Sequence, residues 1–188
     1  MSPKKLRIDH PLDEQYQALY DMALSVAEAY LAHANSLIEQ IHDRKLHTHM
    51  LISVRIKTPG CWTATWAKKV MVKDTKMSGV AVQKLRAKSK AVAGEVLTVD
   101  LPKGEGFSYK ASTFNSLPRE LREVALLYER LLADLRKAGQ ENRSLRRSLD
   151  YHAARTNKIL GQCNASLDAS RLLRNAIYSD APPQSLPE

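Results

Sequence analysis

With 188 residues, of which 44% are hydrophobic and 26% charged, the chain can form one ordinary domain with a packed core, so wholesale disorder is excluded. It has no apolar run near the roughly 18 residues of a membrane helix, no secretory apolar stretch after its basic start, and only two cysteines, too few for a disulfide framework. The formal net charge is +9, and we expect a cytoplasmic protein with no membrane segment.

The positive charge is concentrated in the middle of the chain. Residues 1–43 carry 3 basic and 7 acidic residues (net −4), residues 44–92 carry 12 and 1 (net +11), and residues 93–188 carry 14 and 12 (net +2). A concentrated charge creates a local potential that attracts polyanions. We therefore expect the central stretch to bind double-stranded DNA in preference to an anionic membrane surface. The alternative is a solvated basic face with no ligand.

The first predicted element is a helix over residues 11–43, where apolar side chains recur every three or four positions. A strand over 49–57 follows, because apolar and polar side chains alternate there, and a second strand covers 61–72. Thr58-Pro59-Gly60 is a turn signal between them. The two strands are therefore predicted to form an antiparallel hairpin.

The second half of the sheet and the last helix come next. Residues 73–93 are basic and fit either a loop or an irregular strand, and residues 95–101 form a third strand. Asn115-Ser116-Leu117-Pro118 combines a capping residue with a first-turn proline, so a long helix is predicted from 116 to about 160.

The predicted fold class is α+β, with a single domain over residues 1–178. A small three-stranded antiparallel sheet over 49–101 is flanked by the two long helices, and residues 179–188 form a disordered tail. The helices either pack as an antiparallel pair within the chain or dimerise.

The C-terminal helix has coiled-coil character. Its apolar residues repeat every 3.5 positions from Leu117 to His152, and one slot falls on Asn142 at an a position. A buried asparagine at such a position favours two strands. Leu145 and Leu149 lie beyond the reach of an antiparallel N-terminal helix and need another surface. We therefore predict a homodimer through Asn142, Leu145 and Leu149.

The basic residues of the sheet and of the stretch that follows it are the predicted phosphate contacts. They are Arg55, Lys57, Lys68, Lys69, Lys73, Lys76, Lys84, Arg86, Lys88 and Lys90. Any reading of bases would come from the hairpin in the major groove. Trp62 and Trp66 share one strand face beside these lysines, and we favour a core role for them over stacking on bases.

Histidines near the first strand are the one candidate for chemistry. His47-Thr48-His49 would point two imidazoles to one side, which suits a divalent metal, and Tyr151 would be the nucleophile of a metal-dependent nickase. No third ligand is evident. We therefore expect no catalytic residue, no metal and no cofactor, and we keep the nickase as an alternative.

Several short segments follow one another in a distinctive order. They are Ser53-Val54-Arg55-Ile56, Trp62-Thr63-Ala64-Thr65-Trp66, Leu101-Pro102-Lys103-Gly104 with Tyr109 and Phe114, and Glu129-Arg130-Leu131-Leu132-Ala133-Asp134-Leu135-Arg136. Over roughly residues 15–150, this order resembles the MobI-type proteins of conjugative plasmids and integrative conjugative elements. The resemblance implies an accessory protein of conjugative transfer that acts at the origin of transfer, within a relaxosome, and helps a relaxase process DNA. A protein–protein adaptor that works through its coiled coil is a further alternative.

Overall fold

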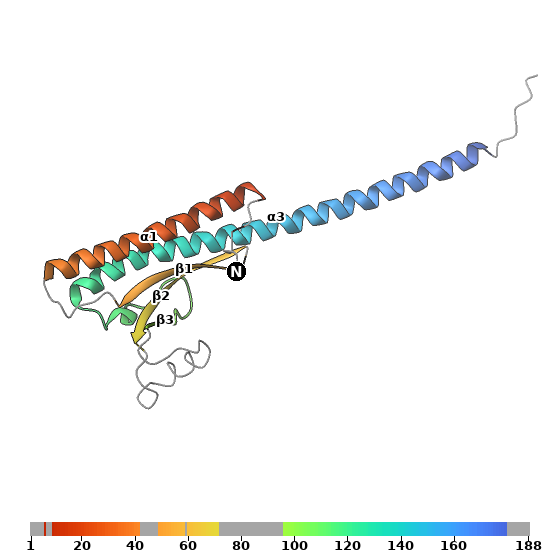
Figure 1. Ribbon diagram of the computed structural model, residues 1–188. Coiled ribbons are helices and arrows are strands. Elements are labelled where there is room, and N and C mark those ends of the chain that lie inside the picture. The colour runs from red at the N-terminus through yellow and green to blue at the C-terminus, as the bar shows by residue number, and fades with distance from the viewer. Residues whose placement is uncertain (1–5, 7–8, 42–48, 59, 72–95, 180–188) are drawn as a thin grey trace, which may run out of the picture. The chain divides into compact units, whose positions relative to one another are not determined.

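The computed structural model describes residues 6, 9–41, 49–58, 60–71 and 96–179 (Figure 1). The elements in chain order are α1 (Pro11–Ile41), β1 (Met50–Thr58), β2 (Cys61–Met71), β3 (Val96–Asp100), the 3-10 helix η1 (Ala111–Phe114) and α3 (Arg119–Ser179). Two long helices and a three-stranded antiparallel sheet confirm the predicted α+β class.

The predicted hairpin is correct to within one residue at each end, whereas the end predicted for the last helix is wrong. α3 continues to Ser179, well beyond the predicted end near residue 160. The sequence prediction ended where the apolar repeat fades. After Pro118 the next proline in the chain is Pro182, so no proline interrupts the helix before Ser179. The loop-or-strand question over 73–93 and the tail after Ser179 lie outside the described residues.

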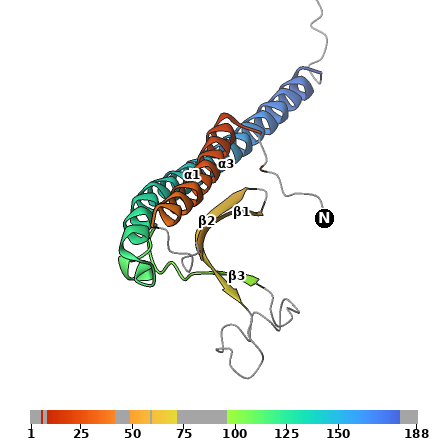
Figure 2. The ribbon, with the colours of Figure 1, turned by 60° about the vertical axis from the view of Figure 1, so that its left-hand side comes forward.

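The sheet has the order β1-β2-β3 with both pairings antiparallel. Ile52 pairs with Trp66 and Val54 with Ala64, so these four side chains share one face of the sheet. The two helices lie on that same face (Figure 2), and its residues join theirs in one hydrophobic core.

Aromatic residues fill the space between sheet and helices. Trp66 is fully buried, with the Tyr30 ring 4.8 Å away and the Phe114 ring 4.9 Å away, both edge-on. Trp62 packs on Tyr16 at 5.9 Å between ring centres. The core role predicted for the tryptophan pair is therefore confirmed. Such edge-to-face pairs contribute about 0.5–1.5 kcal/mol beyond the area they bury.

The two helices pack antiparallel. Near one end Asn142 contacts Leu12, and towards the other end the ring of Tyr128 lies 5.7 Å from that of Tyr30. Gly139 explains part of the close fit, because a Cβ built there would lie 3.1 Å from a ring carbon of Trp62. A glycine that weakens an isolated helix therefore lets the tryptophan approach α3.

Packing divides the chain into two units, Met1–Asn142 and Arg143–Glu188, where the sequence led us to expect one domain over 1–178. The first unit contains the sheet, α1, η1 and the start of α3. The second contains the rest of α3, in which every residue from Arg147 to Asn175 is exposed. Within the described part of the chain, no helix is long and apolar enough to cross a membrane.

Candidate functional site

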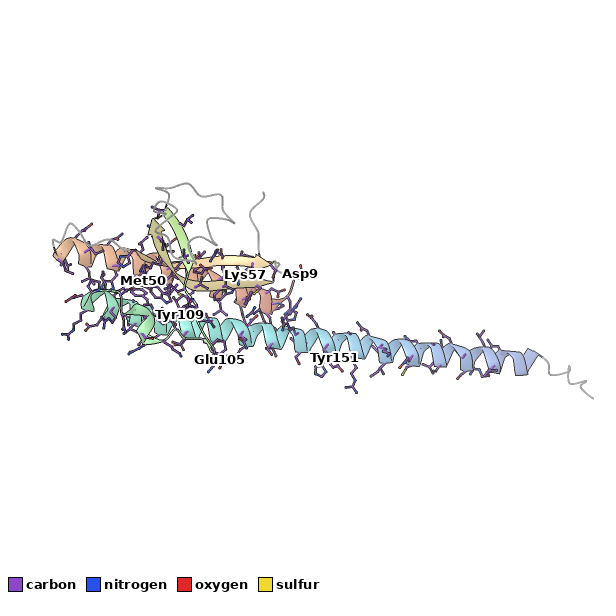
Figure 3. The ribbon with its side chains drawn as sticks, turned by 90° about the horizontal axis from the view of Figure 1, so that it is seen from below. Asp9, Met50, Lys57, Glu105, Tyr109 and Tyr151 are labelled. Atoms are coloured by element: carbon purple, nitrogen blue, oxygen red, sulfur yellow. The ribbon has the colours of Figure 1, made fainter. Side chains whose placement is uncertain are left out.

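The sheet face opposite the helices carries the polar and charged side chains of the strands. Odd-numbered residues of β1 up to Arg55 and of β2 up to Lys69 point to this side, and the register aligns those of β2 with even-numbered residues of β3. This surface, called the outer face below, presents Arg55, Lys57, Lys69, Thr98 and Asp100, all of them exposed. Lys57 lies at the register shift near the end of β1. Figure 3 marks Lys57 near the end of β1. Three of the predicted phosphate contacts thus lie on one face.

Arg55 on the outer face forms an ion pair with Asp100 from β3, a residue that the sequence analysis did not single out. The hydroxyl of Thr65, on the strand between them, lies 3.4 Å from Asp100 Oδ1 and donates to it. About half of each charged side chain remains exposed, 53% for Arg55 and 46% for Asp100. Asp100 therefore holds the guanidinium in place and offsets part of its charge.

Lys68 lies on the other side of the sheet from Lys69. It pairs in register with Met50 on β1 and with Val99 on β3, and it is half-buried. Lys68 and Lys69, both predicted phosphate contacts, therefore lie on opposite faces of the sheet, because neighbouring residues of a strand alternate between faces.

Six predicted phosphate contacts fall between β2 and β3, outside the described residues. They are Lys73, Lys76, Lys84, Arg86, Lys88 and Lys90. The structure does fix where this connection begins and ends, because Met71 and Val96 on either side of it are paired with each other. Met71 and Val96 thus hold the two ends of this connection at one end of the β2–β3 pair.

A buried carboxylate organises the core behind the sheet. Glu129 of α3 is only 2% exposed and accepts hydrogen bonds from Trp66 Nε1 at 2.5 Å, the Tyr109 backbone N–H at 2.7 Å and Arg136 Nη1 at 2.8 Å. Arg136 also donates to the carbonyl oxygen of Phe107 at 2.7 Å. The charge pair is therefore buried and hydrogen-bonded from several sides, as a stable buried pair requires.

Tyr109 joins this network between the sheet and α3 (Figure 3). The guanidinium carbon of Arg136 lies 5.2 Å from the centre of its ring. Burial raises the pKa of Tyr109, and it raises that of Tyr30 to about 12. Burial, and next the charge of Arg136, lower the pKa of Lys103 nearby. Both tyrosines therefore keep their protons at neutral pH, and Tyr109 donates to the carbonyl oxygen of Leu101 at 3.1 Å.

Along part of β2, side chains instead of a neighbouring strand form hydrogen bonds with the backbone groups of the strand edge. β3 pairs only with Ala67–Met71, so the preceding backbone groups on that edge need other partners. The N–H of Trp62 donates to the Tyr16 hydroxyl at 3.1 Å and that of Trp66 to the Tyr109 hydroxyl at 3.3 Å. The carbonyl oxygen of Ala64 accepts from Arg136 Nε at 2.8 Å. These three bonds, called the side-chain edge below, tie β2 to both helices.

Comparison with known proteins identifies a family. A family model described as "MobI protein" matches residues 19–150. The chain belongs to the MobI family. No curated protein and no solved structure matches it. Membership of the MobI family makes this a protein related to conjugative transfer, and the match confirms the resemblance noted in the sequence.

The stretch matched by the MobI family contains the buried network, which sequence reasoning missed. Glu129 occupies a position on α3 four residues after buried Ala125 and three before buried Leu132. A carboxylate on the buried stripe of a helix is rarely tolerated without a partner. The position of Glu129 in the sequence could therefore have indicated a buried carboxylate with a partner. Arg136, seven residues later, lies on the same side of the helix.

Asn142 forms a hydrogen bond within the chain of this MobI-family member. Its Nδ2 donates to the carbonyl oxygen of Leu12 at 3.0 Å. This bond to α1 is a partner that the sequence analysis did not foresee, and the pairing of Asn142 with its own symmetry mate stays a prediction. Leu145 and Leu149 are 51% and 42% exposed, and the dimer prediction depends on them.

The histidine candidates are only partly described. His47 lies outside the described residues, and His49 immediately precedes β1. Tyr151 is 65% exposed on α3. Among the side chains that the structure describes, no three of histidine, cysteine, aspartate and glutamate gather where they could hold a metal ion.

Proposed function

We propose that this MobI-family protein binds double-stranded DNA at the origin of transfer, as an accessory of the relaxosome that helps the relaxase process DNA. The outer face is the observation that supports this proposal. Both helices lie on the opposite side of the sheet, so Arg55, Lys57 and Lys69 face outward together. The sequence between Met71 of β2 and Val96 of β3 contains 6 basic and 2 acidic residues (net +4).

The outer face would act mainly through the phosphate backbone. Lys57 and Lys69 place ammonium groups on neighbouring strands, and such contacts position a protein without reading sequence. Arg55 is held by Asp100, so a phosphate must share or replace that carboxylate. The β1–β2 hairpin is a two-stranded ribbon, a shape that the major groove admits, and it would supply any reading of bases.

We propose a binding role rather than a catalytic one. The buried charged pair, Glu129 and Arg136, is engaged by backbone and side-chain groups of the fold itself, which supports a structural role for it. The nickase alternative requires metal-dependent cleavage. Nicking of supercoiled origin DNA with Mg²⁺ or Mn²⁺ that disappears in His47→Ala would replace the accessory role with the nickase.

The outer face is tested by two lysines that are neighbours in sequence but lie on opposite faces. We expect binding to duplex DNA to weaken steeply with salt, because each neutralised phosphate contributes about −0.9 to the slope of log K against log salt. Lys69→Gln should make that slope shallower by about 0.9. Lys68→Gln removes the same charge from the helix-facing side and should leave the slope unchanged.

Fluorescence anisotropy at several salt concentrations measures both variants on origin DNA and on unrelated DNA of equal length. Tighter binding to the origin fragment supports the proposed place of action. Equal slopes for Lys68→Gln and Lys69→Gln would move the DNA surface elsewhere, and a wild-type protein without affinity for duplex DNA would remove the proposal.

We further propose that the protein is a homodimer through the second unit. Leu145, Leu149, Ile159 and Cys163 continue the repeat of α3 at a and d positions, and the three aliphatic side chains are exposed by between 42% and 51%. In a parallel in-register pair, each of these residues meets its own copy.

Cys163 makes the dimer testable. In a Cys61→Ser background, mild oxidation with diamide should join two chains through their Cys163 thiols, each of which loses one proton and one electron to the oxidant. Moving the cysteine to the opposite side of the helix, with Cys163→Ser and Ala165→Cys, should abolish the cross-link. A monomeric mass in sedimentation equilibrium at high micromolar concentration would contradict the dimer.

A further inference from the structure

The start of the second unit presents an exposed basic surface that the outer face does not include. Five residues of α3 make up this surface, called the basic face below: Arg143, Arg147, Tyr151, Arg155 and Lys158. Their spacings of four, four, four and three residues keep them within about 120° of arc on an ideal helix. Arg143 is half-buried and the other four are exposed.

The opposite side of the same helix is apolar. Leu145, Leu149, Leu160 and Leu167 lie within about 60° of one another, roughly opposite the middle of the basic face. All four are between 42% and 57% exposed. Pairing of two chains through these leucines would therefore leave the basic face turned outward.

The charge of this segment is not balanced by its own carboxylates. Residues 143–179 contain 7 basic and 2 acidic residues (net +5), and no acidic residue occurs over 151–167. The two carboxylates are engaged by arginines outside the basic face. Asp150 lies 3.6 Å from Arg146, and Asp168 lies 3.4 Å from Arg171. The basic face therefore lies in a segment whose formal net charge is positive.

We propose that the basic face is a second contact for the phosphate backbone of duplex DNA. This inference rests on the proposed function and adds a site that the sheet does not contain. The distance from Arg143 to Lys158 along the helix is about 22 Å, enough to follow several phosphates, and a helix fits the major groove. The hydroxyl of Tyr151 can donate to a phosphate oxygen beside the cations.

The composition of the two faces favours nucleic acid over a membrane surface. Helices that lie in a membrane interface place aromatic side chains with their apolar residues. Here the aromatic residue of this stretch, Tyr151, lies among the cations, while His152 and Thr156 interrupt the leucine side. The family match ends at residue 150, so Tyr151, Arg155 and Lys158 lie beyond it.

The test compares two fourfold variants with the same net charge. The first replaces Arg143, Arg147, Arg155 and Lys158 with glutamine. The control replaces the following exposed residues of the first unit with glutamine: Lys110, Arg119, Arg130 and Lys137. Both lower the formal net charge from +9 to +5. We expect the first to make the salt slope for duplex DNA shallower by about 1.8–3.6, for two to four lost contacts, and the control to keep the wild-type slope.

A charge-preserving variant distinguishes the effect of lost charge from the effect of lost structure. Arg143→Lys, Arg147→Lys and Arg155→Lys together should restore the slope, because a phosphate contact needs the charge, and circular dichroism should show unchanged helix content in every variant. If the glutamine variant loses helix, the lysine variant combined with Lys158→Gln is tested in its place. Its slope of log K against log salt should be shallower than that of the wild-type protein by about 0.9, for one lost contact.

The outcomes separate this inference from the proposed function. Equal slopes for the two fourfold variants, with Lys69→Gln still effective, would overturn the basic face and leave the outer face standing. Loss of binding to vesicles of anionic phospholipid, with the DNA slope unchanged, would assign the basic face to a membrane instead. If the wild-type protein fails to bind duplex DNA, both proposals are wrong.

Discussion

Replacing Glu129 with alanine is expected to lower the free energy of unfolding by about 3–5 kcal/mol. The substitution leaves the Arg136 guanidinium buried without its counter-charge, and it leaves the Trp66 indole and the Tyr109 N–H without their acceptor. A typical domain is held folded by about 5–15 kcal/mol, so this change alone endangers folding at 37 °C. Urea unfolding followed by tryptophan fluorescence measures it, since both tryptophans lie in the first unit.

Two further variants serve as a control and a test of coupling for Glu129→Ala. Asp134→Ala removes an exposed carboxylate from the same helix and should change stability by no more than about 0.5 kcal/mol. Glu129→Ala combined with Arg136→Ala should cost less than the sum of the two single changes, because no unpaired charge then stays buried. A Glu129→Ala protein that loses under about 1 kcal/mol would show that the network does not stabilise the fold.

Trp66→Ala is expected to cost a similar amount, about 3–5 kcal/mol, because it empties a fully buried site between Tyr30 and Phe114. The sharper comparison uses phenylalanine at both tryptophans. Trp66→Phe removes the donor to Glu129, whereas the Nε1 atom of Trp62 has no hydrogen-bond partner among the described residues. Trp66→Phe should therefore cost about 1–3 kcal/mol more than Trp62→Phe.

Urea midpoints of the two phenylalanine variants decide this comparison, with the remaining tryptophan of each as the fluorescent probe. Equal losses at Trp62 and Trp66 would mean that ring volume alone matters at these sites. The hydrogen bond to Glu129 would then contribute nothing measurable.

Local patterns were enough to predict the sheet and its core. Alternation along β1 and β2 and the Pro59-Gly60 turn are short-range properties, so the hairpin and the inward tryptophans follow from them. The same alternation, applied to Lys68, would have separated it from Lys69, since Lys68 shares the parity of inward Trp66.

The buried network of Glu129 and the contact of Asn142 with Leu12 could not be predicted from local sequence patterns. Glu129 meets Trp66 across 63 residues, and Asn142 meets Leu12 across 130, so their partners are known only once the elements have packed. A 3.5-residue repeat looks the same whether its partner helix lies in the same chain or in a second one. The sequence therefore predicted an apolar seam along α3 but did not predict the contact of Asn142 with Leu12.

The side-chain edge of β2 also affects the order in which contacts form while the chain is being synthesised. Its three bonds join residues 46, 43 and 72 positions apart, so none of them forms from a local turn. Contacts of long sequence separation form late because closing the intervening loop costs entropy. The hairpin can fold as soon as Met71 has left the ribosome, but its open edge waits for Arg136. We expect this interval to be when the nascent chain most needs a chaperone, since an unpaired strand edge invites pairing with other chains.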